Sequence, residues 1–235
     1  MLFYCYKMIG ILSVLVCVMA VGYALLAQEL TINGRASIDS TWKVEITNIA
    51  SKDVVGDTIE FAGSNWKVIK NSTNDEDYVT LMKETVLTNS ELGKYANGVT
   101  DTMYFHENSN VYATSKVKEM LETSYLPTIG ANNLKEVDGY KIRLITTDEL
   151  TSNLGWINLQ ASATTDNENA NVPTWVYQNF GDQNKGVYGY WTMTPHPDYS
   201  NIVRKVSDAG YFGQDNVDSS VGVRPVINLL KSSIE

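Results

Sequence analysis

The chain has 235 residues and a formal net charge of −9, with 18 Lys and Arg against 27 Asp and Glu. This length suits one or two domains, and 43% hydrophobic residues supply a core, which excludes a disordered acidic tail. The acidic balance argues against nucleic acid as a partner, because binding to phosphates needs clustered Lys and Arg.

Residues 8–27 read MIGILSVLVCVMAVGYALLA and contain no charge. Twenty apolar residues in a helix span the ~30 Å hydrocarbon core of a bilayer. Lys7 precedes the run and Glu29 follows it, which predicts a cytoplasmic N-terminus and an outward-facing remainder. Gly22 and Ala24 also fit a signal-peptidase site after Ala24. Two fates therefore stay open, a cleaved signal peptide and a retained membrane anchor through 8–27.

Cysteine and histidine give no sign of a cross-linked or metal-bound structure. Both cysteines, Cys5 and Cys17, lie in the leader, and residues 28–235 contain none. The exported part is therefore expected to depend on its core without a disulfide. His106 and His196 have no partner at the spacing of a zinc site, so no zinc is predicted.

Three segments are predicted: a leader at 1–27, an N-terminal strand pair with its linker at 28–56, and a main domain at 57–235. In the second segment, apolar residues alternate with polar ones on both sides of a turn at Asn33-Gly34. Two strands cannot bury a face alone. This segment is expected to pack on the main domain, on a partner or near the membrane.

The main domain is predicted to be α+β. Helices are expected at 114–125, capped by Thr114 or Ser115 and closed by Pro127, and at a shorter segment capped by Thr147. Residues 151–187 show no sustained period and are predicted to form a long loop. Strands are expected at 58–62, 66–70, 78–87, 140–145, 188–194, 202–207, 211–212 and 221–229.

The predicted loop is the candidate ligand-binding region, because long ordered loops are often functional. Aromatic residues concentrate there among Asn, Gln and Asp, a combination typical of sugar- and protein-binding surfaces. We expect these aromatic side chains to be partly exposed and clustered, whereas Tyr190 and Trp191 are expected in the core. The predicted ligand-binding residues are Trp156, Asp166, Glu168, Asn169, Asn171, Trp175 and Tyr177.

Four of these residues form an oxygen-rich run that is compatible with calcium: Asp166, Glu168, Asn169 and Asn171. The run departs from the EF-hand pattern, since Ala170 stands where a ligand belongs and no glycine provides the turn. A solvated acidic loop is therefore predicted, with no cofactor and no catalytic residue.

Several segments occur in an order that carries a family resemblance: 59–61 (IEF), 65–69 (NWKVI), 112–115 (YATS), 143–146 (RLIT), 189–192 (GYWT) and 222–229 (GVRPVINL). They resemble a bacterial domain of unknown function related to the C-type-lectin-like fold. The resemblance covers about 57–231. It implies short antiparallel strands with two helices and a long loop region, and a first strand that pairs near 221–229.

The resemblance also bears on activity. The same fold occurs in formylglycine-generating enzymes, but their chemistry depends on cysteines that residues 28–235 lack. The lectin calcium signatures EPN and WND are absent as well. Arg224, in the GVRPVINL segment, is expected to make structural hydrogen bonds. The leader and the stretch after it resemble exported Firmicutes-type surface or biofilm-matrix proteins.

The predicted function is that of an exported ligand-binding or adhesion module without catalytic activity, located at the cell surface or secreted. Its expected partner is an extracellular glycan or protein. One alternative is a structural matrix or pilus-like subunit, in which the N-terminal strands add to a neighbour's sheet. Another is a hydrolase whose carboxylate pair cannot be recognised from sequence spacing.

Overall fold

The computed structural model describes residues 37–38, 44–45, 54–70, 76–157 and 169–234. The chain divides into two compact units, Met1–Ser51 and Lys52–Glu235. In the first unit, β1 (Ser37–Ile38) pairs antiparallel with β2 (Val44–Glu45). The predicted membrane segment 8–27 lies outside the described residues, among which no helix has the length and apolar character needed to cross a bilayer.

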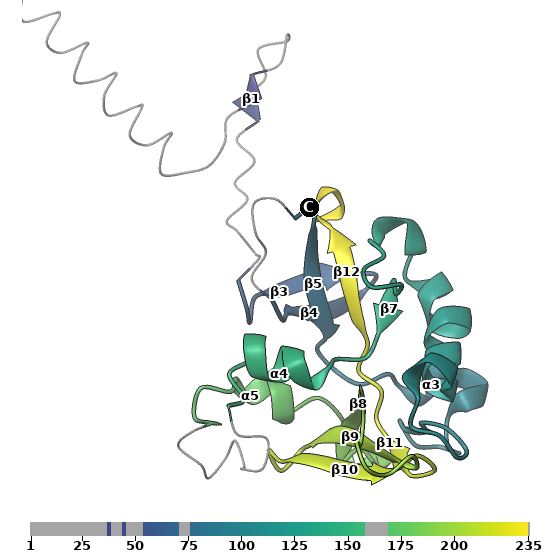
Figure 1. Ribbon diagram of the computed structural model, residues 1–235. Helices are drawn as coiled ribbons and strands as arrows, with labels where there is room; N and C mark the ends of the chain where they lie inside the picture. Colours follow the sequence, from purple (N-terminus) through teal and green to yellow (C-terminus); the bar gives the residue numbers. More distant parts are fainter. Residues whose placement is uncertain (1–36, 39–43, 46–53, 71–75, 158–168, 235) are drawn as a thin grey trace, which may run out of the picture. The chain divides into compact units, whose positions relative to one another are not determined.

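The second unit contains a five-stranded antiparallel sheet with the order β3-β4-β5-β12-β7 (Figure 1). A tight turn joins β3 to β4, and β12 pairs with β5 along five residues. The strands are β3 (Thr58–Phe61), β4 (Ser64–Val68), β5 (Tyr78–Lys83), β7 (Ile142–Arg143) and β12 (Val226–Leu230).

The pairing of the first strand of this sheet differs from the prediction. The resemblance placed 58–62 next to 221–229, but β3 lies at the edge and two strands separate it from β12. The physical reason is local: a two-residue connection at 62–63 allows β3 and β4 to pair only with each other on that side. The place beside β12 is taken by β5 on one side and β7 on the other.

Two smaller antiparallel sheets complete the unit. One has the order β10-β9-β8, with β8 (Gly189–Pro195), β9 (Ile202–Ser207) and β10 (Phe212–Asn216). The other pairs β11 (Ser220–Val221) with β6 (Met103–Tyr104). The single strand predicted at 221–229 is therefore two strands, β11 and β12, separated by residues 222–225.

A close backbone approach accounts for this interruption. The Gly222 amide donates to the Gly189 carbonyl at 3.0 Å, and the Trp191 amide donates to the Gly222 carbonyl at 3.0 Å. A Cβ on Gly222 would lie 2.7 Å from the Gly189 oxygen and 2.7 Å from Val86 Cγ1. Only glycine fits such an approach. Residues 222–225 therefore cross β8 before the chain enters the large sheet.

The predicted long helix begins at its expected cap, where Ser115 Oγ accepts from the Lys118 amide at 3.0 Å. It runs as α3 (Lys116–Met120), a π-helical segment η3 (Leu121–Tyr125) and a 3₁₀ turn η4 (Leu126–Thr128). Pro127 lies inside this last turn instead of ending the helix before it. The other helices are α2 (Asn89–Leu92), α4 (Thr147–Asn153) and α5 (Thr174–Tyr177).

Short 3₁₀ turns fill several connections: η1 (Gly93–Tyr95), η2 (Tyr112–Thr114), η5 (Ala131–Asn133), η7 (Gln183–Lys185) and η8 (Lys231–Ser233). Two of the helical segments, α5 and η7, fall within the predicted loop at 151–187. The described part of that segment is therefore not purely irregular.

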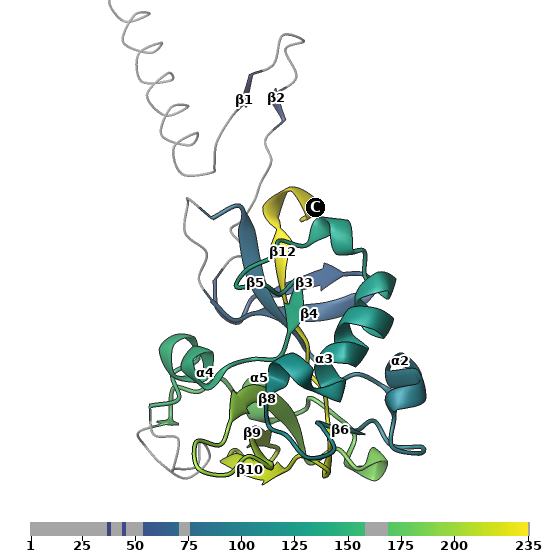
Figure 2. The ribbon, with the colours of Figure 1, turned by 45° about the vertical axis from the view of Figure 1, so that its right-hand side comes forward.

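Two hydrophobic cores lie on opposite faces of the large sheet. Figures 1 and 2 show α3 on one side of the sheet and α4 and α5 on the other. Side chains of β12 alternate accordingly, with Ile227 in the first core and Val226 in the second. Trp66 and Trp191 belong to the first core, with α3 against them. The described structure is thus α+β with short antiparallel sheets, as predicted.

Four of the described tyrosines are buried, and three of them, Tyr112, Tyr125 and Tyr190, make the fold sensitive to alkali. Burial raises the pKa of Tyr190 to about 12, and raises the pKa values of Tyr112 and Tyr125 above the ordinary tyrosine value. In the unfolded chain these tyrosines lose their protons at pH ~10, whereas in the folded chain they keep them at that pH. Their stabilising contribution is therefore complete below pH ~10 and falls as the pH rises toward 12.

We expect the tyrosinate absorbance to rise in two stages during an alkaline titration. Exposed tyrosines should ionise first and reversibly. Tyr112, Tyr125 and Tyr190 should ionise only as the far-ultraviolet circular dichroism is lost. Ionisation of all tyrosines in one step, with native circular dichroism retained, would contradict this expectation.

Candidate functional site

The structure places the predicted aromatic ligand-binding residues mainly in the core. Trp156 is 0% exposed and Tyr177 is 5% exposed, and both belong to the second core. Their rings meet edge to face with centroids 6.5 Å apart. The expectation of partly exposed rings is therefore wrong for these two residues. The Trp156 amide donates to the Leu150 carbonyl at 3.1 Å, which folds the chain back after α4 and directs it into the core.

The other predicted residues that the structure describes differ in exposure. Trp175 is half-buried, Asn169 is buried and Asn171 is exposed. Asp166 and Glu168 lie outside the described residues, so the calcium prediction stays a prediction. Among the residues that the structure describes, no three His, Cys, Asp or Glu side chains come together as metal ligands would.

Arg224 has the structural role expected of it. Its side chain is fully buried, Nε donates to the Lys83 carbonyl at 2.8 Å and Nη1 donates to the Val176 carbonyl at 3.1 Å. Burial lowers the pKa of the guanidinium. Arg224 thereby joins the start of β12 to β5 and α5. Its guanidinium carbon also lies 5.1–5.7 Å from the ring centroids of Trp175, Phe180 and Tyr190.

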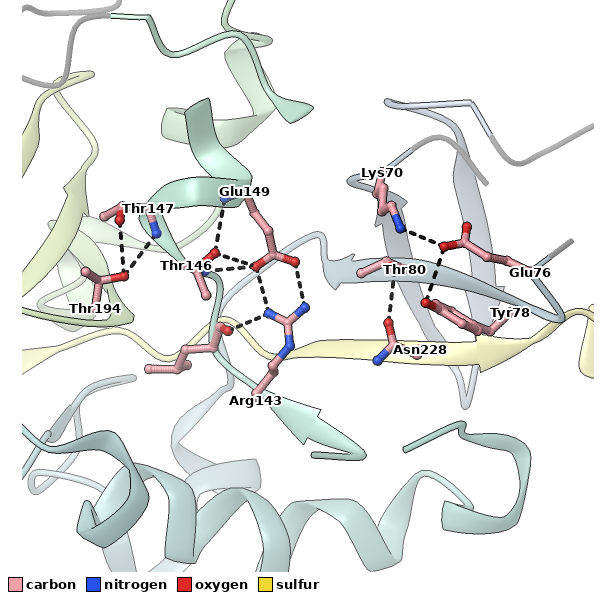
Figure 3. Close-up of polar contacts among 11 residues, drawn as sticks. Lys70, Glu76, Tyr78, Thr80, Arg143, Thr146, Thr147, Glu149, Thr194 and Asn228 are labelled. Atoms are coloured by element: carbon pink, nitrogen blue, oxygen red, sulfur yellow. Dashed lines mark hydrogen bonds and ion pairs between the residues drawn. The ribbon is translucent and has the colours of Figure 1, made fainter. Parts of the chain in front are cut away.

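A polar network fixes α4 to the sheet (Figure 3). Arg143 Nη1 and Nη2 donate to the two carboxylate oxygens of Glu149 at 2.7 and 2.6 Å. The same carboxylate accepts from the Thr146 amide at 2.9 Å, while Thr146 Oγ1 accepts from the Glu149 amide at 3.1 Å. This is a capping box, and the cap is Thr146, one residue before the predicted Thr147. The Thr147 amide donates to Thr194 Oγ1 at 3.0 Å, which joins α4 to β8.

Figure 3 also shows two separate groups of polar contacts at and near β5 and β12. Thr80 Oγ1 donates to Asn228 Oδ1 at 3.0 Å across the two strands. Lys70 Nζ lies 2.7 Å from Glu76 Oε1, and this hydrogen bond raises the pKa of Lys70. Both carboxylates in Figure 3 are thus paired with a cation. These contacts join the start of α4 to β7 and β8, and join β5 to β12.

A hollow of about 280 Å³ forms where the chain leaves α5. We call it the amide pocket. Gln178 and Asn179 are exposed, and their side-chain amides have no hydrogen-bond partner among the described residues. Phe180 and Val187 are buried and support the hollow from beneath. The full lining is Gln178, Asn179, Phe180, Gly181, Gln183, Val187 and Asp208.

The floor of the amide pocket is held rigidly. The Phe180 carbonyl accepts from the Val86 amide at 2.7 Å, and the Phe180 ring meets Tyr190 edge to face at 5.0 Å. A Cβ on Gly181 would lie 2.3 Å from Val187 Cγ1, so only glycine allows this packing. Asn179 has a φ of 57°, a left-handed conformation that Asn tolerates better than most residues.

One wall of the amide pocket is closed by a side-chain hydrogen bond. Gln183 Nε2 donates to Asp208 Oδ2 at 2.6 Å. This bond joins η7 to the turn between β9 and β10, 25 residues away in sequence. The lining therefore offers three amides and one carboxylate, which can donate and accept hydrogen bonds to a ligand.

A second hollow, of about 470 Å³, lies beside α2. We call it the helix groove. Its carboxylate Glu91 accepts from the Thr88 amide at 2.7 Å and lies 3.6 Å from Lys83 Nζ. The Glu91 carboxylate is thus already paired within the fold, whereas the side-chain amides of Gln178 and Asn179 are available to a ligand. The groove is lined by Ala62, Ser64, Ser90, Glu91, Leu92, Gly93, Lys94, Ser124, Tyr125, Thr128 and Ile129.

Comparisons with known proteins add no relative. No family model, curated protein or solved structure matches this chain. The resemblance to C-type-lectin-like domains therefore rests on the sequence segments alone and stays a prediction. The available polar groups of the amide pocket were not singled out from the sequence. Only the richness of the 151–187 segment in Asn and Gln pointed toward them, and no sequence signal connected Asp208 to that segment.

Proposed function

We propose that this chain is an exported, non-catalytic binding module at or near the cell surface, and that the amide pocket holds its ligand, an extracellular glycan or protein. The apolar run at 8–27 supports export. The finer fold assignment, a C-type-lectin-like domain, belongs to the same proposal and is supported by the order of the sequence segments and by the short antiparallel strands.

One observation carries the proposal. The side-chain amides of Gln178 and Asn179 are exposed at the rim of a hollow and have no hydrogen-bond partner among the described residues. Binding sites commonly combine a preformed apolar surface with a few fixed polar groups. Here the rim supplies the polar groups, and the buried Phe180 and Val187 fix the shape of the hollow from beneath. Because the floor is packed against the second core, little ordering is needed when a ligand binds.

The proposal predicts that small changes at the rim weaken binding without affecting the fold. In a Gln178→Ala, Asn179→Gly double variant, we expect at least a tenfold loss of affinity, ~1.4 kcal/mol. Glycine is chosen at 179 because alanine would be strained at a φ of 57°. The melting temperature should change little, since both side chains are exposed. Glycan and protein arrays identify the ligand, and titration calorimetry measures its affinity.

Asn171→Ala is the matched control, because Asn171 is an exposed amide in the same region and does not line the pocket. It should bind like the wild type. Unchanged affinity in the double variant would contradict the proposed site. Chemical conversion of the bound ligand would contradict a non-catalytic role, and fibre formation by the purified full chain without any ligand would favour the structural-subunit alternative.

A further inference from the structure

We infer that the helix groove is a second binding site, and that it takes a small hydroxylated ligand with one carboxylate, a sugar acid. The inference goes beyond the proposed function, since no residue lines both the helix groove and the amide pocket. The groove lies between the turn that joins β3 to β4, helix α2 and the segments η3 and η4. Its volume of about 470 Å³ is in the range of small-molecule sites.

A hydroxyl without a partner is the first observation that points to a ligand. Tyr125 lines the groove and is only 3% exposed, and its hydroxyl has no hydrogen-bond partner among the described residues. Unlike the enclosed hydroxyl of Tyr112, it is open to solvent. Burial and the charge of Glu91 raise the pKa of Tyr125, so the hydroxyl keeps its proton and can donate. A polar group in this position needs a partner from outside the fold.

Three serines add further free hydroxyls to the lining. The side chains of Ser64, Ser90 and Ser124 have no hydrogen-bond partner among the described residues. Thr128 differs, because its Oγ1 donates to the Tyr125 carbonyl at 2.7 Å. A hydroxyl can donate and accept at once, so the free ones can pair with the hydroxyls of a ligand and can also donate to a carboxylate.

The unpaired charge of the groove is positive. Lys94 makes no ion pair among the described residues, and its Nζ lies 4.9 Å from the centroid of the Tyr95 ring. The other charged residue of the lining, Glu91, is compensated by Lys83, whose Nζ lies 3.6 Å from it. A free ammonium among hydroxyl donors suits a single carboxylate. A phosphate is disfavoured, because Glu91 repels its second negative charge.

Four probes test the two parts of the ligand: glucuronate, glucose, acetate and glucose 6-phosphate. Titrated into the full chain, glucuronate should bind at least about tenfold more tightly than each of the others. Glucose lacks the carboxylate, acetate lacks the hydroxyls, and glucose 6-phosphate carries a second negative charge. Added salt should weaken the binding of glucuronate and leave that of glucose nearly unchanged, since only the first ligand is charged.

Two variants each remove one group from the groove. Lys94→Gln should weaken glucuronate binding about tenfold and remove its salt dependence. Tyr125→Phe should weaken glucuronate binding severalfold, while the melting temperature should not fall, because the lost hydroxyl has no partner within the described fold. Lys116→Gln removes the same charge outside the groove. It is the matched control and should bind glucuronate like the wild type.

The outcomes separate this inference from the proposed function. Glucuronate binding that is absent, that equals glucose or acetate binding, or that Lys94→Gln leaves unchanged overturns the inference, as does a preference for glucose 6-phosphate. The Gln178→Ala, Asn179→Gly double variant should bind glucuronate like the wild type, so the two sites can fail independently. If that variant loses glucuronate binding instead, the acid binds in the amide pocket and the assignment to the helix groove is wrong.

Discussion

Replacing Trp156 by Ala is expected to lower the free energy of unfolding by about 3–5 kcal/mol. The side chain is fully buried, and its ring contacts Tyr177 and Phe212 at centroid distances of 6.5 and 6.2 Å. The indole Nε1 has no hydrogen-bond partner among the described residues. The loss therefore comes from packing and from the cavity that remains, and chemical denaturation of the full chain measures it.

Trp175→Ala is the matched comparison, because Trp175 has the same side chain three residues from Gln178 but is only half-buried. It should cost clearly less than Trp156→Ala. If Trp156 were instead exposed at a binding surface, its removal would reduce ligand affinity and leave stability nearly unchanged. Equal, small losses of stability in both variants would therefore refute its placement in the core.

Glu149→Ala is expected to have a comparable effect through electrostatics. Removing one partner of a fully buried ion pair costs about 3–5 kcal/mol because the other charge stays behind. The Arg143 and Glu149 side chains are 13% and 16% exposed, so the pair is partly buried and the loss should approach the lower end of this range. The capping box at the start of α4 is lost as well, for ~1 kcal/mol. Thermal and denaturant unfolding of the variant test this expectation.

Two further variants separate the contributions at Glu149. Glu149→Gln keeps a side chain that can complete a capping box, so it isolates the loss of charge. Glu107→Ala breaks the exposed ion pair with Lys116, and the two side chains are 72% and 42% exposed. It should have little effect on stability, because solvent screens an exposed pair. If Glu107→Ala and Glu149→Ala destabilise the protein equally, burial does not set the strength of the Arg143–Glu149 pair.

Elements with a strong local pattern were predictable from the sequence. Strand β9 (Ile202–Ser207) and the cap at Ser115 occur where they were expected, because alternation and capping depend on neighbouring residues. Helix α5 was missed, since four residues give no helical period. The place of β12 between β5 and β7 could not be inferred either, because it is decided by contacts far apart in sequence.

The candidate site was also only partly predictable from the sequence. Composition indicated that 151–187 combines aromatic residues with amides, but it did not show which of them point outward. The structure puts Trp156 and Tyr177 inside and leaves Gln178 and Asn179 outside. Asp208 joins them from another strand connection through Gln183. That contact depends on how the β10-β9-β8 sheet packs against η7, and no local pattern encodes it.

The position of β12 between β5 and β7 has a kinetic consequence. The hydrogen bond between Thr80 and Asn228 joins residues 148 positions apart, and the large sheet cannot close until both are in place. Closing so long a loop costs entropy before any contact compensates for it, and sheets of this kind fold slowly. A chain with this topology keeps its large sheet open until the last strand arrives, so completion of that sheet is a late step of folding.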